Sequence, residues 1–183
     1  MGLDRLFIHI ADNYYLNGKA TWVDDKMISE LKDELKFHRD NQLGFKAPEI
    51  HLLDSALSPI NLYSQSKDYI VLFFYDPDCG HCKKKTPVLA DVYRGMPDDV
   101  EIMAINVGTD ISKWKSFIRQ NNLEWVNAAD PYYKSNFRMQ YNVRSTPMIY
   151  ILDKDKNIIA KRLNVEDIDG FINDHREYME KGL

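Results

Sequence analysis

Three features that would narrow the function are missing from this chain. Its longest nearly apolar run, residues 69–75, is far shorter than the roughly 18 residues that cross a bilayer. Basic and acidic residues are mixed along the chain and give a net charge of -4, so no basic face for nucleic acid is indicated. The first residues lack the basic start and the apolar core of a signal peptide. We therefore expect no membrane span in this chain and no nucleic-acid partner.

Cysteine is also scarce, because Cys79 and Cys82 are the only two in the chain. A C-x₂-C pair commonly supplies half of a tetrahedral zinc site, but here the other half is missing and the remaining histidines are scattered. A c-type haem would need a histidine directly after the second cysteine, where Lys83 stands. A structural disulfide closed over two residues would constrain little of the unfolded chain. We expect no metal, and redox chemistry is the preferred role of the pair.

Residues 1–43 are predicted to form a helical segment. Apolar residues recur at spacings of three and four in 3–16 and again in 24–37, and acidic residues open the second stretch. We interpret the aromatic residues of this segment as core or docking surface rather than as a cofactor site: Phe7, Tyr14, Tyr15 and Trp22. Because the chain begins in what looks like the interior of a helical region, we expect the segment to belong to an upstream region.

From residue 44 onward the pattern indicates a separate α/β domain that spans 44–183. Gly44, Pro48 and Pro59 interrupt the stretch 41–59, which is predicted as extended linker or edge structure. Beyond it, strands are predicted at 69–75, 100–107, 124–129, 147–152 and 157–163, and helices at 81–96, 110–122, 132–141 and 165–179. This alternation, with a hairpin near its end, indicates a mixed central sheet with helices on both faces.

The two cysteines lie where the strand ending at Tyr75 gives way to a helix. The sulfur of Cys79 is therefore expected beside unpaired N–H groups at the helix N-terminus, where the helix dipole and the second thiol lower its pKa. Cys79 is the expected nucleophile, and Cys82, one turn deeper, can attack the resulting mixed disulfide and release the reduced substrate. The expected redox group is then the Cys79–Cys82 disulfide itself, with no bound cofactor.

Charged neighbours are expected to tune the pair. His81, between the cysteines, can stabilise the Cys79 thiolate, which favours the reduced form and makes the disulfide more oxidising. The basic run 83–85 acts in the same direction, whereas Asp76 and Asp78 oppose it.

Together these features resemble the thioredoxin superfamily: a hydrophobic strand, C-G-H-C at a helix start, Pro87 five residues later, and "STP" (145–147) before a strand. More narrowly, "KAPEIHLLD", the "MAINVG" strand and the extra segment 124–143 resemble the TlpA/ResA-like thiol-disulfide oxidoreductases. The resemblance covers about residues 45–178. It implies a thioredoxin-like fold, preceded here by the N-terminal helical segment.

The resemblance also implies a function, namely exchange of a dithiol for a disulfide on protein substrates. Pro147 would be cis, and the backbone of Thr146 would bind an extended substrate and hold its disulfide near Cys79. The pair Gly80 and His81 resembles that of protein disulfide isomerase. The implied setting is the bacterial cell envelope or periplasm, with a membrane-bound electron donor as a partner and a role in cell redox homeostasis.

Three positions depart from the family pattern. Phe73 stands where thioredoxin has a buried acid, and Asp78 replaces the tryptophan that often precedes the first cysteine. Lys85 occupies the position where many TlpA/ResA-like proteins have a glutamate. The group that deprotonates Cys82 therefore stays open, with Lys85 and water as candidates.

Two other functions stay open beside this one. A peroxiredoxin-like peroxide reductase would normally place its cysteine in a Thr-x-x-Cys setting, which "DPDC" lacks. A non-catalytic thioredoxin-fold binding module would present the Thr146 loop to a partner, and its binding would depend on surface aromatics such as Tyr132 and Tyr133.

Overall fold

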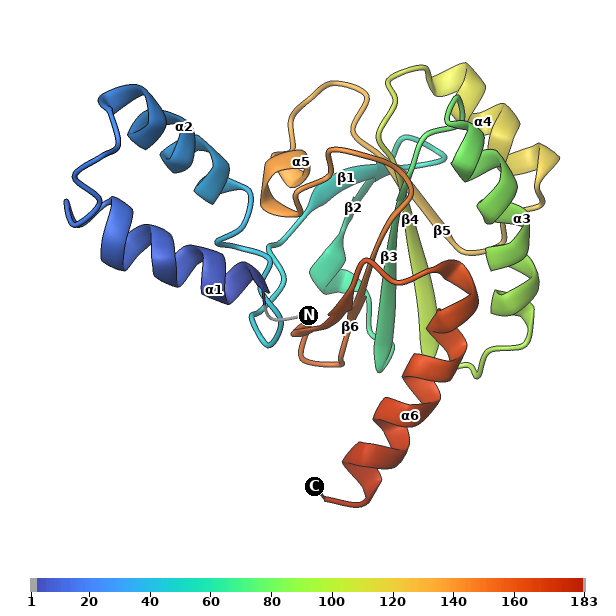
Figure 1. Cartoon of the computed structure of the whole chain (residues 1–183). Helices are drawn as coiled ribbons and strands as arrows, with labels where there is room; N and C mark the ends of the chain where they lie inside the picture. Colours follow the sequence, from blue (N-terminus) through green and yellow to red (C-terminus); the bar gives the residue numbers. More distant parts are fainter. Residues whose placement is uncertain (1–2, 183) are drawn as a thin grey trace.

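The computed structural model describes residues 3–182 and has a seven-stranded mixed sheet at its centre, in the order β2-β1-β5-β4-β3-β6-β7 (Figure 1). The strands are β1 (His51–Asp54), β2 (Pro59–Asn61), β3 (Tyr69–Tyr75), β4 (Val100–Asn106), β5 (Val126–Ala129), β6 (Met148–Leu152) and β7 (Ile158–Lys161). The α-helices are α1 (Leu3–Ile10), α2 (Asp25–Lys36), α3 (Gly80–Arg94), α4 (Ile111–Gln120), α5 (Phe137–Gln140) and α6 (Ile168–Glu180). The predicted α/β fold, a mixed sheet preceded by a helical segment, is confirmed.

Strand β3 occupies an interior position of the sheet, and all of its residues are buried. It pairs in parallel with β4, from Tyr69 opposite Val100 to Tyr75 opposite Asn106, and antiparallel with β6. A strand that is covered on both faces requires apolar residues on both, which is why its sequence is a continuous apolar run rather than an alternating one. The strand ends at Tyr75, directly before the segment that carries the cysteines.

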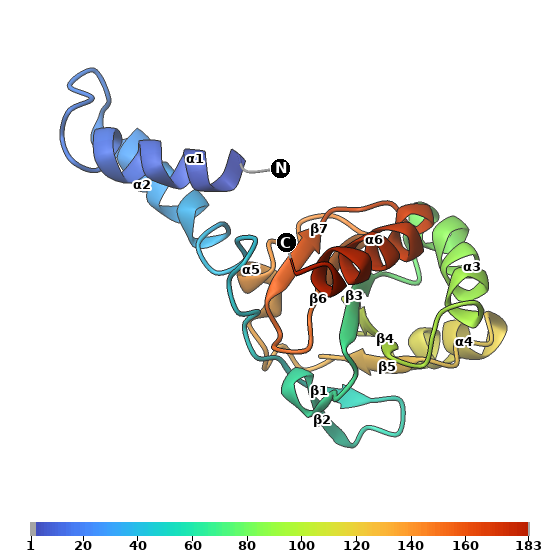
Figure 2. The ribbon, with the colours of Figure 1, turned by 90° about the horizontal axis from the view of Figure 1, so that it is seen from below.

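The side chains of β3 divide the core into two layers. The odd-numbered side chains face α3, α4 and α6, where Leu89, Trp114 and Ile168 are buried. The even-numbered side chains face the short helix α5 and the segment 47–62. Figure 2 shows α3, α4 and α6 together on one side of the curved sheet. Helices therefore cover both faces, as predicted, but the helical layer is much larger on the side of the cysteine-bearing helix.

Helix α5 is much shorter than predicted, since only Phe137–Gln140 of the predicted stretch 132–141 is helical. The Asp130 carboxylate accepts hydrogen bonds from the backbone N–H groups of Lys134 and Ser135, which stabilises a turn instead of a helical start. Tyr133 adopts a φ of 52°, outside the right-handed helical region. The prediction failed because apolar spacing does not register this local side-chain competition.

The stretch predicted as linker or edge structure is edge structure in part. Strands β1 and β2 form an antiparallel hairpin, and β1 pairs antiparallel with β5, so β2 forms the outer edge of the sheet. Between Gly44 and Ala47 the chain is hydrogen-bonded along β7, including Gly44 N–H to the Ile158 carbonyl at 2.8 Å. The domain boundary near Gly44 stays a prediction.

The N-terminal segment forms a helical hairpin of α1, a π-helical turn (Ala11–Tyr15) and α2, and it projects from the body of the molecule (Figure 2). We refer to residues 3–40 as the N-terminal hairpin. Its aromatic residues are not core, since Tyr14 is 51% and Trp22 75% exposed and Phe7 and Tyr15 are only half-buried. The core interpretation was wrong because α1 and α2 are too few elements to enclose an apolar centre. Their role as docking surface stays a prediction.

Candidate active site

Cys79 is the N-cap residue of α3, immediately after the turn that follows β3. Its backbone N–H donates to the Asp76 carbonyl at 3.0 Å, and the Asp78 N–H donates to the Asp76 carboxylate at 2.8 Å. These bonds fix the turn "DPDC", so that the first thiol stands at the N-terminal end of a helix of 15 residues. The first turn of that helix has unpaired backbone N–H groups and the positive end of the helix dipole, which favour a negative sulfur.

The loop before β6 brings Thr146 and Pro147 against this helix start. The Cys79 thiol donates to the Thr146 carbonyl, with 3.3 Å between sulfur and oxygen. The Thr146–Pro147 peptide bond is cis. Met148, the first residue of β6, lies opposite Phe74 in the antiparallel pair, so the sheet register positions the loop beside the cysteines. The structure thus brings the loop at Thr146, which is distant in sequence, against Cys79 and Cys82.

The pKa of Cys79 is lowered below the ordinary thiol value. Partial burial raises it, but hydrogen bonds from the Thr146 hydroxyl, from the Cys82 backbone N–H and thiol, and from the His81 backbone N–H together outweigh that effect. In the thiol form Cys79 makes no capping hydrogen bond and instead donates to Thr146. On losing its proton the sulfur becomes an acceptor for these N–H groups, which stabilises the thiolate and makes Cys79 the better nucleophile.

Cys82 has the opposite character. Its side chain is fully buried, and burial raises its pKa to about 11 despite the hydrogen bond that its sulfur accepts from the Asp76 backbone N–H at 3.5 Å. Both cysteines are free thiols in this structure. Two thiols one turn apart therefore differ in access and in acidity, with the accessible and more acidic one nearest the loop.

The residues predicted to tune the cysteines, His81 and Gly80, do not place a side chain against the Cys79 sulfur. The His81 side chain is exposed, and it is the His81 backbone N–H that acts on the Cys79 pKa. Gly80 is the first residue of α3 and has open space around its Cα. The Lys85 ammonium is hydrogen-bonded to Glu166, so a nearby carboxylate offsets its charge at the cysteines. The tuning role of His81 and Gly80 stays a prediction.

Two ion pairs next to the cysteines were not foreseen. Glu166 pairs with Lys85, and Lys113 pairs with Asp78 at 2.8 Å. The pKa of the Asp78 carboxyl lies below its ordinary value, because of the hydrogen bond and charge of Lys113. In each pair the two residues come from elements that are distant in sequence. Their opposite charges are visible in the sequence, but the sequence does not show that the two side chains lie close together.

Phe73, which stands where thioredoxin has a buried acid, is fully buried and stacks on Tyr75 with 5.5 Å between ring centroids. The Tyr75 hydroxyl accepts a hydrogen bond from the Trp114 indole at 3.0 Å. Phe73, Tyr75 and Cys82 belong to the same buried cluster, so an aromatic ring rather than a carboxylate occupies position 73. Among residues 3–182 no three His, Cys, Asp or Glu side chains are grouped as a metal site would need.

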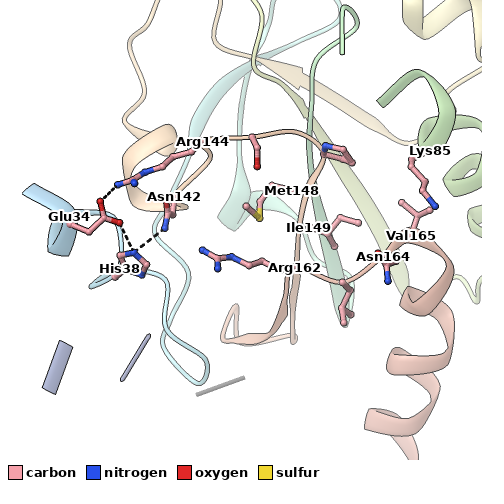
Figure 3. Close-up of a pocket in the computed structure, with 13 residues that line it drawn as sticks. Glu34, His38, Lys85, Asn142, Arg144, Met148, Ile149, Arg162, Asn164 and Val165 are labelled. Atoms are coloured by element: carbon pink, nitrogen blue, oxygen red, sulfur yellow. Dashed lines mark hydrogen bonds and ion pairs between the residues drawn. The ribbon is translucent and has the colours of Figure 1, made fainter. Parts of the chain in front are cut away.

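A pocket of about 540 Å³ adjoins the Thr146 loop, and Figure 3 shows its lining. One wall comes from the N-terminal hairpin, with Glu34 and His38, and the opposite wall comes from the segment 162–165 and Lys85. The loop residues on either side of Thr146, Ser145 and Pro147, also line it. The pocket is thus continuous with the loop that contacts Cys79.

Comparisons with known proteins agree with this geometry. Residues 67–158 match the model of a family described as thioredoxin-like. A domain of a possible thiol-disulfide isomerase from Cytophaga hutchinsonii is 33% identical, with 76% of this chain and 96% of that chain covered and a TM-score of 0.71. This chain therefore belongs to the thioredoxin-like family, within the TlpA/ResA-like group of the thioredoxin superfamily that its sequence resembles.

Two further solved structures share the fold. The thioredoxin domain of a thiol-disulfide oxidoreductase from Bacteroides vulgatus is 22% identical, with 73% of this chain and 96% of that chain covered and a TM-score of 0.67. A thioredoxin-like protein from Bacteroides caccae is 20% identical, with 86% of this chain covered and a TM-score of 0.78, and this chain spans 58% of its length. A search of the curated proteins finds no match. No helix within residues 3–182 combines the length and apolar character needed to cross a bilayer.

Proposed function

We propose that this protein is a thiol-disulfide oxidoreductase that exchanges the Cys79–Cys82 dithiol with disulfides of protein substrates. The observation that carries the proposal is the contrast between an accessible Cys79 of lowered pKa and a fully buried Cys82 with a pKa of about 11. An attacking thiol must reach its target as a thiolate, whereas a resolving thiol must stay protonated until the mixed disulfide has formed.

In the first step the Cys79 thiolate attacks one sulfur of the substrate disulfide. A Cys79–substrate bond forms, the substrate's own disulfide breaks, and the released substrate sulfur takes a proton from solvent. Cys82 then gives up its proton and attacks the Cys79 sulfur, which forms the Cys79–Cys82 disulfide and releases the second substrate thiol. The substrate gains two electrons and two protons, which the two cysteines lose, and the reverse sequence oxidises a substrate dithiol.

Substrate docking is proposed at Thr146 and Pro147. The Thr146 carbonyl lies 3.3 Å from the Cys79 sulfur, so a backbone that paired with this residue would hold its own cysteine near the nucleophile. The resemblance to TlpA/ResA-like proteins supports the remaining parts of the proposal: a bacterial cell envelope or periplasmic setting, and a membrane-bound electron donor.

Trapping of the mixed disulfide tests the function. Cys82→Ser should accumulate a covalent complex with a disulfide-bonded peptide, since the resolving thiol is gone, and dithiothreitol should reverse the complex. Cys79→Ser, the matched control, should form none because the remaining thiol is buried. Full dithiol turnover by Cys82→Ser, or equal trapping by both variants, would overturn the mechanism. A binding module would instead keep its affinity for a partner in Cys79→Ser.

A further inference from the structure

The pocket beside the Thr146 loop has an unequal charge balance. Three cationic side chains line it, Lys85, Arg144 and Arg162, against the single carboxylate of Glu34. Its floor is apolar, with Met148 and Ile149 at the start of β6. A cavity with an apolar floor and excess positive charge at its rim favours an anionic group carried on a partly apolar chain.

Two of the three cations are already paired. Lys85 is bound to Glu166, and Arg144 donates to one oxygen of Glu34 at 2.7 Å while its guanidinium lies over the Phe37 ring at 4.0 Å. The other oxygen of Glu34 pairs with His38 at 3.1 Å. Both oxygens of Glu34 are therefore engaged within the N-terminal hairpin and the loop, and neither forms an ion pair with Arg162.

Of the three cations that line the pocket, Arg162 is the one that forms no ion pair with a carboxylate among residues 3–182. Figure 3 shows its side chain extending into the middle of the pocket, between His38 on one side and Asn164 on the other. Its backbone has a φ of 60°, and its N–H donates to the Ile149 carbonyl at 2.8 Å. The sheet thus fixes the backbone at Arg162, no carboxylate holds its guanidinium, and the guanidinium donors are available to a ligand.

We propose that this pocket binds an acidic segment of the substrate protein, and that Arg162 is the specificity-determining residue that receives its carboxylate. The proposal rests on the proposed function, because the ligand is the chain whose disulfide reacts at Cys79. A peptide is favoured over a small anion because Ser145 and Pro147 line the pocket on both sides of the proposed docking residue Thr146. An extended chain docked there would carry its neighbouring side chains into the pocket, and a planar guanidinium matches a carboxylate with two hydrogen bonds.

The test compares two synthetic peptides that are identical except that glutamates near the cysteine are replaced by glutamines. Each is carried as a mixed disulfide with 2-mercaptoethanol, and its single-turnover reaction with the reduced protein is followed by acid quench and mass spectrometry. Each rate is divided by the rate with free dithiothreitol, which removes the peptide's intrinsic reactivity. The variants are Arg162→Gln, Arg162→Lys as the conservative change, and Arg119→Gln as a charge-matched control on α4.

The normalised rate should be about tenfold higher for the glutamate peptide, the size of one good charge-assisted contact. Arg162→Gln should bring the ratio near one, Arg162→Lys should restore part of it, and Arg119→Gln should leave it unchanged. Equal rates in the wild type, or an unchanged ratio in Arg162→Gln, would overturn the inference. The inference would also be overturned if Arg162→Gln slowed exchange with oxidised glutathione as much as it slowed exchange with the glutamate peptide. The pocket would then bind free carboxylates rather than an acidic peptide.

A second readout separates this inference from the proposed function. If neither peptide reacts, the exchange function fails, and equilibrium binding of cysteine-free versions by fluorescence anisotropy decides on the pocket alone. Tighter binding of the glutamate version that is lost in Arg162→Gln supports the inference, and equal binding of both versions overturns it.

Discussion

The N-terminal hairpin and the thioredoxin-like body are stabilised in different ways. In the hairpin the buried apolar side chains are Ala11, Ala20 and Leu35, whereas all of β3 (Tyr69–Tyr75) is buried. The hairpin leaves large apolar side chains exposed, including Leu6 at 53% and Trp22 at 75%. Because apolar burial is the main favourable term in folding, the hairpin gains little of it on its own.

Charged contacts attach the hairpin to the body instead. Asp4 pairs with His38 within the hairpin and with Lys161 of β7, each at 2.8 Å. The Lys161 ammonium, only 6% exposed, also donates to Asn41. At the other end of the interface Glu34 pairs with Arg144, two residues before Thr146. The placement of one pocket wall therefore depends on ion pairs, whereas the active-site framework depends on the core.

The largest effect is expected from the core of the body. Phe74→Ala removes a fully buried ring that stacks on Phe137 and packs against Tyr141, and should lower the free energy of unfolding by about 3–5 kcal/mol. Leu6→Ala in the hairpin should change it by less than about 0.5 kcal/mol, since Leu6 is exposed. Urea denaturation measures both. Comparable losses would mean that the hairpin has an apolar core of its own.

An intermediate effect is expected at the buried end of the interface. Asp4→Asn leaves the Lys161 ammonium without its carboxylate and should cost about 2 kcal/mol. The double variant Asp4→Asn with Lys161→Met should cost less than the sum of the two single changes. Asp25→Asn, on an exposed position of α2, is the control and should be neutral. Strict additivity in urea denaturation would show that the pair does not anchor the hairpin.

Acid should release the hairpin before it loosens the core. Burial raises the Asp4 pKa, but hydrogen bonds with Lys161 and His38 outweigh this effect, so the pKa lies below its ordinary value. The hydrogen bond from Arg144 likewise lowers the Glu34 pKa. Carboxyls of lowered pKa contribute stability above their unfolded values near about 4, and that stability is lost as pH falls through the folded values. Hydrogen exchange, corrected for the intrinsic pH dependence, should show α1 and α2 opening below about pH 4 while β3 stays protected. If α1, α2 and β3 opened at the same pH, the hairpin would not be held by these ion pairs separately from the core.

The smallest effect on stability is expected from the more exposed ion pair, that of Glu34 with Arg144. Glu34→Gln removes the one carboxylate of the pocket and should change the free energy of unfolding by less than about 1 kcal/mol. Exchange with the glutamate peptide should nevertheless rise about twofold, because Arg144 loses its internal partner. The same peptide kinetics measure it, with Glu30→Gln on the outer side of α2 as the control. A fall in rate would indicate that Glu34 positions the loop rather than competing with the substrate.

Much of the fold could be predicted from the sequence because its signals are local. The continuous apolar run of β3, the Cys79 position at a helix start and the cysteine spacing each depend on neighbouring residues. The length of α5 was predicted wrongly because the Asp130 side chain competes with the helix. The burial of the hairpin aromatics was predicted wrongly because periodicity shows an apolar face but not what covers it. The pairs of Asp4 with Lys161 and of Lys85 with Glu166 join residues far apart in sequence, where charge alone does not identify a partner.

The redox equilibrium of the purified protein against a series of glutathione or dithiothreitol buffers tests most directly whether Cys79 and Cys82 form a redox couple. Alkylation and intact mass report the two thiols. We expect one reversible two-electron transition in which Cys79 and Cys82 become protected together, at a potential above about -270 mV because the Cys79 thiolate is stabilised. The absence of any reversible couple between the two cysteines would contradict it.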